Sequence, residues 1–121
     1  MATINTAVEH ASKLRPDVFD DNCKAAWLNE LEGKIWLEVM HKPCFEPYEY
    51  PGDGDKELAV KAPYDNIYEL YIVAMSDFFS GEMGNYAASS AMFDYAYLEF
   101  CKYYIRNNMP PQKKLKIQGV L

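Results

Sequence analysis

Apolar residues recur at helical spacing along most of the chain, and one stretch without periodicity interrupts them. In residues 4–14 they fall at i, i+4 and i+7, and in residues 21–41 at i, i+3, i+7 and i+11. This pattern predicts two helices, the first ended by Pro16 and the second capped by Asp20. The spacing of Thr6 and Glu9 is that of a capping box, which would instead start the first helix at Ala7. Gly33, in the middle of the second helix, suggests that another helix approaches closely there.

Residues 43–63 lack a helical pattern. They contain four prolines and the turn sequence Gly52-Asp53-Gly54-Asp55, so they predict a long irregular loop. Leu58-Ala59-Val60 is the one part with strand character and predicts at most a short strand or hairpin.

Two further helices are predicted over residues 64–81 and 86–107, and the short link between them makes an antiparallel hairpin. Gly81 or Gly84 would end the third helix in a left-handed cap, and Asn85 would cap the fourth. The third helix is apolar nearly all round, which predicts that it is the most buried. The expected core comprises Trp27, Leu31, Ile35, Leu70, Ala74, Phe78, Phe93 and Leu98.

These patterns together predict a mainly α fold. We expect a small bundle of about four helices with a C-terminal hairpin, a long Pro/Gly loop and at most a short β element. Residues 1–109 would form a single helical domain, and residues 110–121 a basic, extended C-terminal tail.

The charge is distributed unevenly along the 121 residues, whose net charge is −6. All eighteen acids lie between Glu9 and Glu99, whereas four of the twelve bases follow residue 105. An acidic body disfavours sequence-specific nucleic-acid binding, and no apolar run is long enough to span a membrane. The N-terminus does not have the pattern of a signal peptide, so we expect a protein of a cytoplasm or of a particle assembled there.

The chain offers little recognisable chemistry. His41 and Cys44 are neighbours but supply only two of the four ligands that a zinc site usually takes. Asp53, Asp55 and Glu57 alternate as in a calcium loop, but without its twelve-residue spacing. We therefore expect no cofactor, no metal site and no enzymatic activity. A catalytic arrangement assembled from distant parts of the chain stays open.

The surplus of tyrosine favours binding to other proteins, because eight of the ten tyrosines lie from Tyr64 onward and cannot all hide in so small a core with satisfied hydroxyls. The alternative is that they occupy half-buried positions at the rim of a monomer. A possible subunit interface comprises Tyr68, Tyr95, Tyr103 and Tyr104. The tail alternates apolar and basic residues, which suits a strand that docks on a partner and also suits a solvated, irregular chain end. Its predicted partner-binding residues are Lys113, Lys114, Leu115, Lys116 and Ile117.

Several runs of residues resemble the small head–tail connector proteins, also called adaptor or head-completion proteins, of long-tailed bacteriophages and prophages. The resemblance covers roughly residues 4–109. In the first half it is carried by Leu14-Arg15-Pro16-Asp17, Phe19-Asp20-Asp21, Lys24 and the run from Trp27 to Ile35. In the second half it is carried by Leu58-Ala59-Val60, Pro63-Tyr64-Asp65, Tyr68-Glu69-Leu70-Tyr71, Gly81-Glu82, Tyr86, Met92-Phe93 and Tyr97-Leu98-Glu99-Phe100.

The resemblance implies a structural virion protein of the phage neck. Such a protein would form a ring of about a dozen copies beneath the portal, contact tail or stopper proteins, and use its C-terminal segment on the portal. It would lie at the head–tail interface of the virion and be made in the host cytoplasm. The alternative is a helical regulatory or protein-binding module that acts as a monomer or dimer, which explains the same helices without a ring.

Overall fold

The chain folds as a mainly helical bundle. The structure is a computed structural model that describes residues 2–15 and 19–108. It contains α1 (Ile4–Leu14), α2 (Asp21–Lys34), α3 (Ile67–Phe79) and α4 (Met83–Asn108). One π-helical turn (Ile35–Val39) continues α2, and one 3-10 turn (Tyr64–Asn66) precedes α3. The described ranges contain no strand, so the predicted mainly α fold with four helices is confirmed.

The first two helices begin where their polar caps place them. Thr3 caps α1, and the Thr6 backbone N–H donates to the Thr3 hydroxyl at 3.1 Å. The capping box therefore joins Thr3 and Thr6, and the alternative start at Ala7 is wrong. Asp20 caps α2 as predicted, accepting from the Cys23 backbone N–H at 2.9 Å. These caps satisfy backbone donors that the first helical turn leaves unpaired.

Gly33 is close to the loop rather than to a helix. A Cβ at this position would lie 3.4 Å from the ring of Phe45, which belongs to residues 43–63. The expected close approach of another helix is therefore wrong, because an aromatic ring from the loop occupies that space. The small residue lets the loop lie flat against α2.

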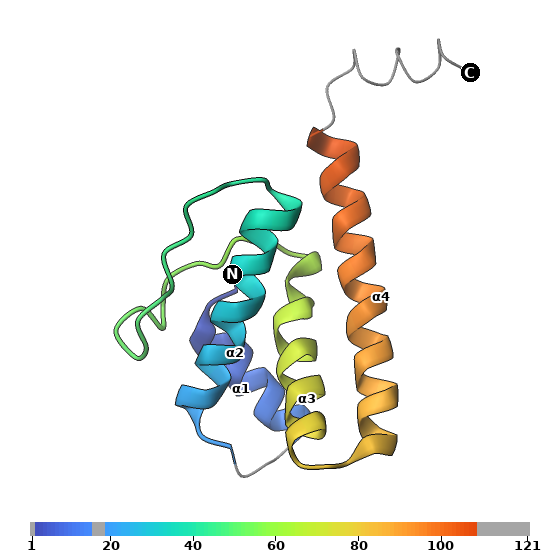
Figure 1. Cartoon of the computed structure of the whole chain (residues 1–121). Helices are drawn as coiled ribbons and strands as arrows, with labels where there is room; N and C mark the ends of the chain where they lie inside the picture. The colour runs from blue at the N-terminus through green and yellow to red at the C-terminus, as the bar shows by residue number, and fades with distance from the viewer. Residues whose placement is uncertain (1, 16–18, 109–121) are drawn as a thin grey trace, which may run out of the picture.

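The third helix lies at the centre of the bundle, with α1 and α2 on one side and α4 on the other (Figure 1). It is the most buried element, as predicted, since eight of its thirteen residues are buried. The core joins its apolar side chains to those of the other helices and of the loop. Its largest buried apolar members are Ile4, Val8, Leu28, Leu31, Ile35, Leu58, Val60, Ile67, Tyr68, Tyr71, Ile72, Val73 and Phe100.

The predicted core is partly wrong. Leu31, Ile35 and Ala74 are buried, and Trp27, Leu70 and Phe93 are half-buried. Phe78 is 45% exposed and Leu98 is 52% exposed. Leu98 is two residues from the buried Phe100, about 200° around the helix, so both side chains cannot face α3. Phe78 lies near the end of α3, where its ring contacts those of Phe79 and Tyr86 and leaves much of its surface open to solvent.

Residues 43–63 form the predicted long loop, but without a β-strand. A single antiparallel bridge joins Thr3 to Glu57, and the Leu58 backbone N–H donates to the Ala2 carbonyl at 2.8 Å. The tip of the loop is held by α1, since the Asn5 side chain donates to Asp55 at 2.7 Å. The predicted short β element is therefore reduced to one bridge that ties the loop to the N-terminus.

The hairpin between α3 and α4 turns at Gly81, which has φ of 79°. The Gly81 N–H bonds to the Phe78 carbonyl at 3.2 Å, and the Glu82 N–H bonds to the Asp77 carbonyl at 3.0 Å. This pair of bonds is the Schellman ending, which favours glycine at the left-handed position. Because α4 already begins at Met83, Asn85 lies inside the helix and is not its cap, contrary to the prediction.

The burial pattern predicts which substitutions by alanine destabilise the fold and which do not. Ile72→Ala removes a side chain that is 1% exposed at the centre of α3. The free energy of unfolding should fall by about 2–5 kcal/mol, because a cavity replaces packed atoms. Leu37→Ala, at a residue 54% exposed, is the matched control and should change it by less than about 0.5 kcal/mol. Equal losses in urea unfolding of the two variants would contradict the assigned core.

Candidate interaction surface

A buried carboxylate, that of Glu32, joins α2 to the loop and to α3. Glu32 is 0% exposed and accepts hydrogen bonds from the Tyr68 hydroxyl at 2.7 Å and the Tyr48 hydroxyl at 3.0 Å. It also accepts from the Ala59 backbone N–H at 2.8 Å. The Tyr68 hydroxyl in turn accepts from the Val60 backbone N–H at 2.9 Å. These bonds satisfy polar groups that would otherwise be costly to bury.

The same carboxylate affects its tyrosine neighbours. Burial, and then the nearby charge of Glu32, raises the pKa of Tyr68 and that of Tyr48 above the ordinary value of 10.0. Burial and the charge of Glu30 raise the pKa of Tyr71 to about 12. These hydroxyls therefore stay protonated to a higher pH than that of an ordinary tyrosine, and they act as hydrogen-bond donors to carboxylates.

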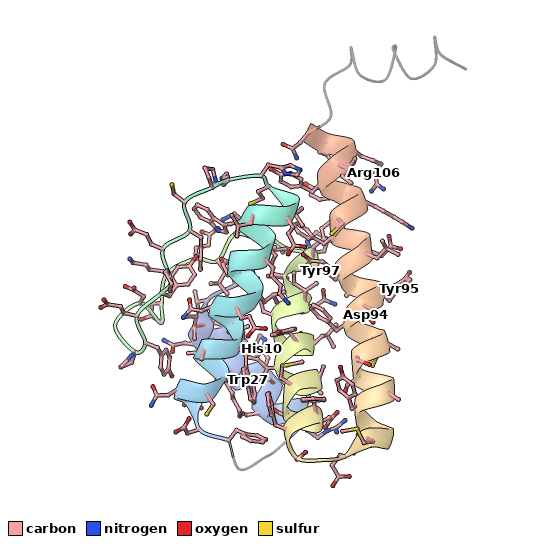
Figure 2. All side chains as sticks on the ribbon, viewed as in Figure 1. His10, Trp27, Asp94, Tyr95, Tyr97 and Arg106 are labelled. Atoms are coloured by element: carbon pink, nitrogen blue, oxygen red, sulfur yellow. The ribbon has the colours of Figure 1, made fainter. Side chains whose placement is uncertain are left out.

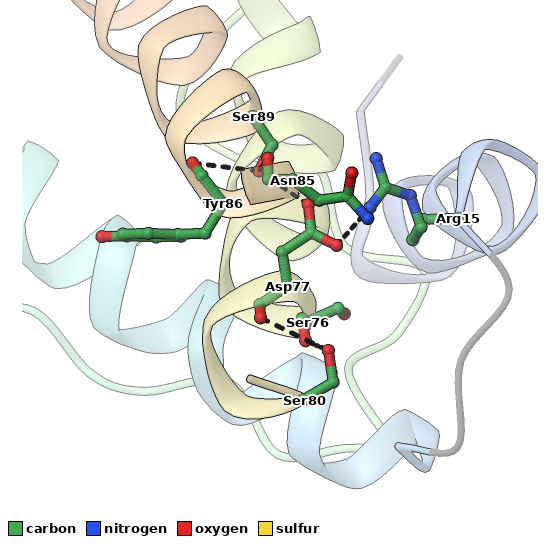
Figure 3. A network of polar contacts seen from close by, with 7 residues as sticks. All are labelled: Arg15, Ser76, Asp77, Ser80, Asn85, Tyr86 and Ser89. Atoms are coloured by element: carbon green, nitrogen blue, oxygen red, sulfur yellow. Dashed lines mark hydrogen bonds and ion pairs between the residues drawn. The ribbon is translucent and has the colours of Figure 1, made fainter. Parts of the chain in front are cut away.

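A second polar network fixes α1 against the α3–α4 hairpin (Figure 3). The Asp77 side chain is 2% exposed. Its Oδ1 forms an ion pair with Arg15, which follows the last residue of α1. The Ser89 hydroxyl of α4 lies 2.8 Å from the Asp77 Oδ2. The Ser80 hydroxyl donates to the Ser76 carbonyl at 2.7 Å, at the end of the same helix. The start of α4 is therefore held in place by one buried carboxylate.

One cleft, of about 390 Å³, contains an acid–base pair. The His10 Nδ1 lies 3.1 Å from the Glu69 Oε2, and the cleft is lined by Ala2, Thr6, Ala7, His10, Asp65, Asn66 and Glu69. The hydroxyl in this lining, that of Thr6, donates to the Thr3 carbonyl at 3.0 Å and completes the cap of α1. Among the lining residues the Thr6 hydroxyl gives its proton to Thr3 and not to His10, so the geometry does not support a nucleophile activated by His10.

The clearest surface feature of the described residues is the outer side of α4. Only Ser89 and Phe100 are buried among its 26 residues. On the side away from α3, Tyr95 is 68%, Leu98 52% and Ile105 51% exposed. Figure 2 shows Tyr95 projecting away from the bundle, whereas Tyr97 projects toward it. We call the exposed apolar positions Ala88, Ala91, Tyr95, Leu98 and Ile105 the outer stripe.

A second exposed apolar patch lies at one end of the bundle, where the first turns of α2 lie beside the last turn of α3. Trp27 stacks on Phe79 with ring centroids 5.6 Å apart, and Phe19 packs edge-on against Trp27 at 5.5 Å. Phe79 is 56% and Phe78 45% exposed. These rings pack on one another, which gives the patch fixed geometry while part of it stays open to solvent.

The predicted interface tyrosines fall into two classes. Tyr68 is 1% exposed and bonded to Glu32, so its place in a subunit interface is wrong: its hydroxyl is used inside the fold. Tyr95 and Tyr103 are exposed on α4, and Tyr104 is half-buried beside Phe100. Their role at an interface stays a prediction. The predicted partner-binding residues, Lys113, Lys114, Leu115, Lys116 and Ile117, lie outside the described residues.

Two acids of the loop, Asp53 and Glu57, form hydrogen bonds or ion pairs with neighbouring loop residues. Asp53 accepts from the Glu49 backbone N–H at 2.8 Å and pairs with Lys56 at 3.2 Å; both bonds lower its pKa, the first of them more. Glu57 is ion-paired with Lys61. Over residues 2–15 and 19–108, no group of three or more His, Cys, Asp or Glu residues is placed to hold a metal ion.

Sequence reasoning missed Glu32 and Asn29, the two side chains of α2 that hold the loop. The Asn29 side chain donates to the Tyr48 carbonyl at 3.0 Å and accepts from the Tyr48 N–H at 2.8 Å. One signal was present: Glu32 follows Leu28 by four residues and so lies on the apolar side of the helix. An acid at such a position indicates a buried hydrogen-bond acceptor.

Comparison with protein-family models, with curated proteins and with solved structures finds no match to this chain. In the ranges that the structure describes, no helix is both long and apolar enough to cross a lipid bilayer.

Tyr68→Phe tests the buried network. Loss of the hydroxyl leaves Glu32 without one donor and the Val60 N–H without its acceptor. The free energy of unfolding should therefore fall by about 1–3 kcal/mol. Tyr95→Phe, at a residue 68% exposed, is the matched control and should stay within about 0.5 kcal/mol of the parent. Urea unfolding measures both, and a neutral Tyr68→Phe would show that the network contributes nothing.

The raised tyrosine pKa values predict alkaline instability. Above the ordinary value of 10.0, the unfolded chain releases phenolic protons that the folded chain retains. The free energy of unfolding should therefore be constant just below that pH and fall above it, by up to about 1.4 kcal/mol per pH unit for each such tyrosine. Denaturant titrations at stepped pH measure the slope, and Tyr68→Phe should make it shallower. An unchanged slope in that variant would contradict the assignment to Tyr68.

Proposed function

We propose that this chain is a structural assembly protein that acts through protein–protein contacts, as a head–tail connector of a phage or prophage neck. In this function it forms an oligomeric ring that joins the portal to the tail or completes the head after DNA packaging. The observation that carries the proposal is the outer stripe of α4. An exposed apolar stripe along most of one helix is typical of a site that a partner covers.

The stripe is prominent for its size and position. Three of its side chains are more than half exposed, and α4 contacts the bundle chiefly through α3. The last turns of α4 extend past the ends of α2 and α3, so a partner can reach them from several sides (Figure 1). A helix whose apolar residues occupy two opposite sides normally has neighbours on both.

The opposite charges of the tail and of residues 1–105 support binding to another copy of the chain or to an acidic partner. The tail that follows Asn108 carries Lys113, Lys114 and Lys116 and no acid, whereas residues 1–105 carry eight bases and eighteen acids. A basic segment on an acidic protein is complementary to another copy or to an acidic partner. An acidic body along a channel would also repel DNA phosphate and leave it free to pass.

The resemblance to connector proteins gives the proposal its specific form. Asn29, Glu32 and Tyr68, which belong to the runs that carry the resemblance, hold the loop against the helices. The shared residues are therefore structural, and they support a common fold more directly than a common partner. The portal as partner rests on the resemblance together with the basic tail.

A chain ending at Met109 tests the tail. We expect it to unfold at the same denaturant concentration as the full chain and to lose binding to the portal protein of the same phage or prophage. Light scattering and sedimentation, on the chain alone and mixed with portal, measure both properties. The reason is that residues 110–121 contribute three of the bases that would meet the portal and none of the side chains that form the described core.

Charge reversal sharpens this test. Lys113→Glu, Lys114→Glu and Lys116→Glu together should abolish portal binding in the full-length chain. Reversal of three exposed lysines of the body, Lys13, Lys34 and Lys56, is the matched control and should leave it intact. Portal binding by the shortened chain would contradict the role of the tail. A full-length chain that ignores the portal would favour a regulatory or protein-binding module.

A further inference from the structure

The outer stripe has the spacing with which long helices pack against one another. Ala88, Ala91, Tyr95, Leu98 and Ile105 follow at steps of three, four, three and seven residues, and Lys102 occupies the remaining position. This is a heptad seam of about two and a half repeats, on the side of α4 opposite the buried Ser89 and Phe100. The helix therefore carries two seams, one covered by α3 and one bare.

The size of the side chains varies along the bare seam. Its first two members are alanines, which let a neighbouring backbone approach closely, and its last apolar member is Ile105. Two such helices fit best when the small end of one meets the large end of the other, because large side chains then fill the space beside small ones. That arrangement is antiparallel.

The charges beside the seam favour the same direction. Asp94 and Glu99 precede Lys102 and Arg106 along α4. Parallel pairing in register would place Lys102 against Lys102 and Asp94 beside Asp94, which is unfavourable. Antiparallel pairing about Leu98 instead places Asp94 of each helix beside Lys102 of the other, which forms two opposite-charge pairs, while the two copies of Glu99 come near each other at the axis.

We propose that the outer stripe of α4 binds the outer stripe of a second copy, antiparallel and about a two-fold axis near Leu98. In this register Ile105 lies against Ala91 of the partner copy, and Asp94 lies beside its Lys102. The contact is isologous, so it closes on itself as a dimer and does not extend into a ring. The dimer covers the stripe in the free protein, and a neck assembly that used the stripe would first have to open it.

This inference does not rest on the proposed function. The dimer requires no portal and is measured on the purified chain alone, whereas the connector proposal is measured by binding to portal. A dimer that ignores portal would leave this inference intact, and a monomer that binds portal would overturn this inference alone.

Disulfide crosslinking tests the direction and register. In the full chain with Cys23, Cys44 and Cys101 replaced by serine, Leu98→Cys should crosslink to itself in high yield on mild oxidation. Ala88→Cys is the matched control, ten residues away on the same stripe. In the antiparallel dimer its two copies are about 30 Å apart, so no crosslink should form. Crosslinking at both positions would show parallel pairing, and crosslinking at neither would show that the two stripes do not meet at Leu98; either result overturns the proposal.

Charge exchange tests the pairing without a new cysteine. Light scattering should give twice the chain mass of 13.9 kDa for the parent chain and the monomer mass for Leu98→Glu at the same concentration. Asp94→Lys and Lys102→Asp should each weaken the dimer at least tenfold, and the two together should restore it. Circular dichroism confirms that each variant is folded. A parent chain that stays monomeric at the highest soluble concentration, or a double variant as weak as the single ones, overturns the proposal.

Discussion

The buried carboxylate of Glu32 is the interaction on which the arrangement of the chain depends. A loop of about twenty residues with four prolines cannot form its own hydrogen-bond ladder, so its polar groups need partners elsewhere. Glu32 supplies acceptor oxygens to Ala59 and Tyr48 of the loop and to Tyr68 of α3 at once. The loop can then place Leu58 and Val60 in the core, where both are 1% exposed.

The other end of the bundle depends on a second buried carboxylate, that of Asp77. Asp77 receives Arg15 from α1 and Ser89 from α4, near the Schellman turn at Gly81. Removal of either partner of such a buried pair would leave a charge without compensation, which is costly in free energy. Together the two carboxylates set the position of α3 relative to every other helix. The long helix α4 then packs by one side only.

The one-sided packing of α4 connects fold to function. A helix that served only to complete a four-helix bundle would need a single apolar side, but α4 has one seam against α3 and another in solvent. Exposed apolar surface costs free energy through its contact with water, and a partner relieves that cost. The connector function and the two-fold dimer both use this surface, and they differ in which partner covers it.

The sequence by itself determined the helices, because their periodicity, their caps at Asp20 and Gly81 and the prolines between them are local properties. It also marked residues 43–63 as irregular. Only the tertiary structure decided which side of each helix is buried, since Leu98 and Phe100 have similar hydrophobicity and the position of α3 alone separates them. For the same reason the sequence misplaced Tyr68. A buried hydroxyl and an interface hydroxyl look alike along the chain, and the acceptor that distinguishes them, Glu32, is 36 residues away.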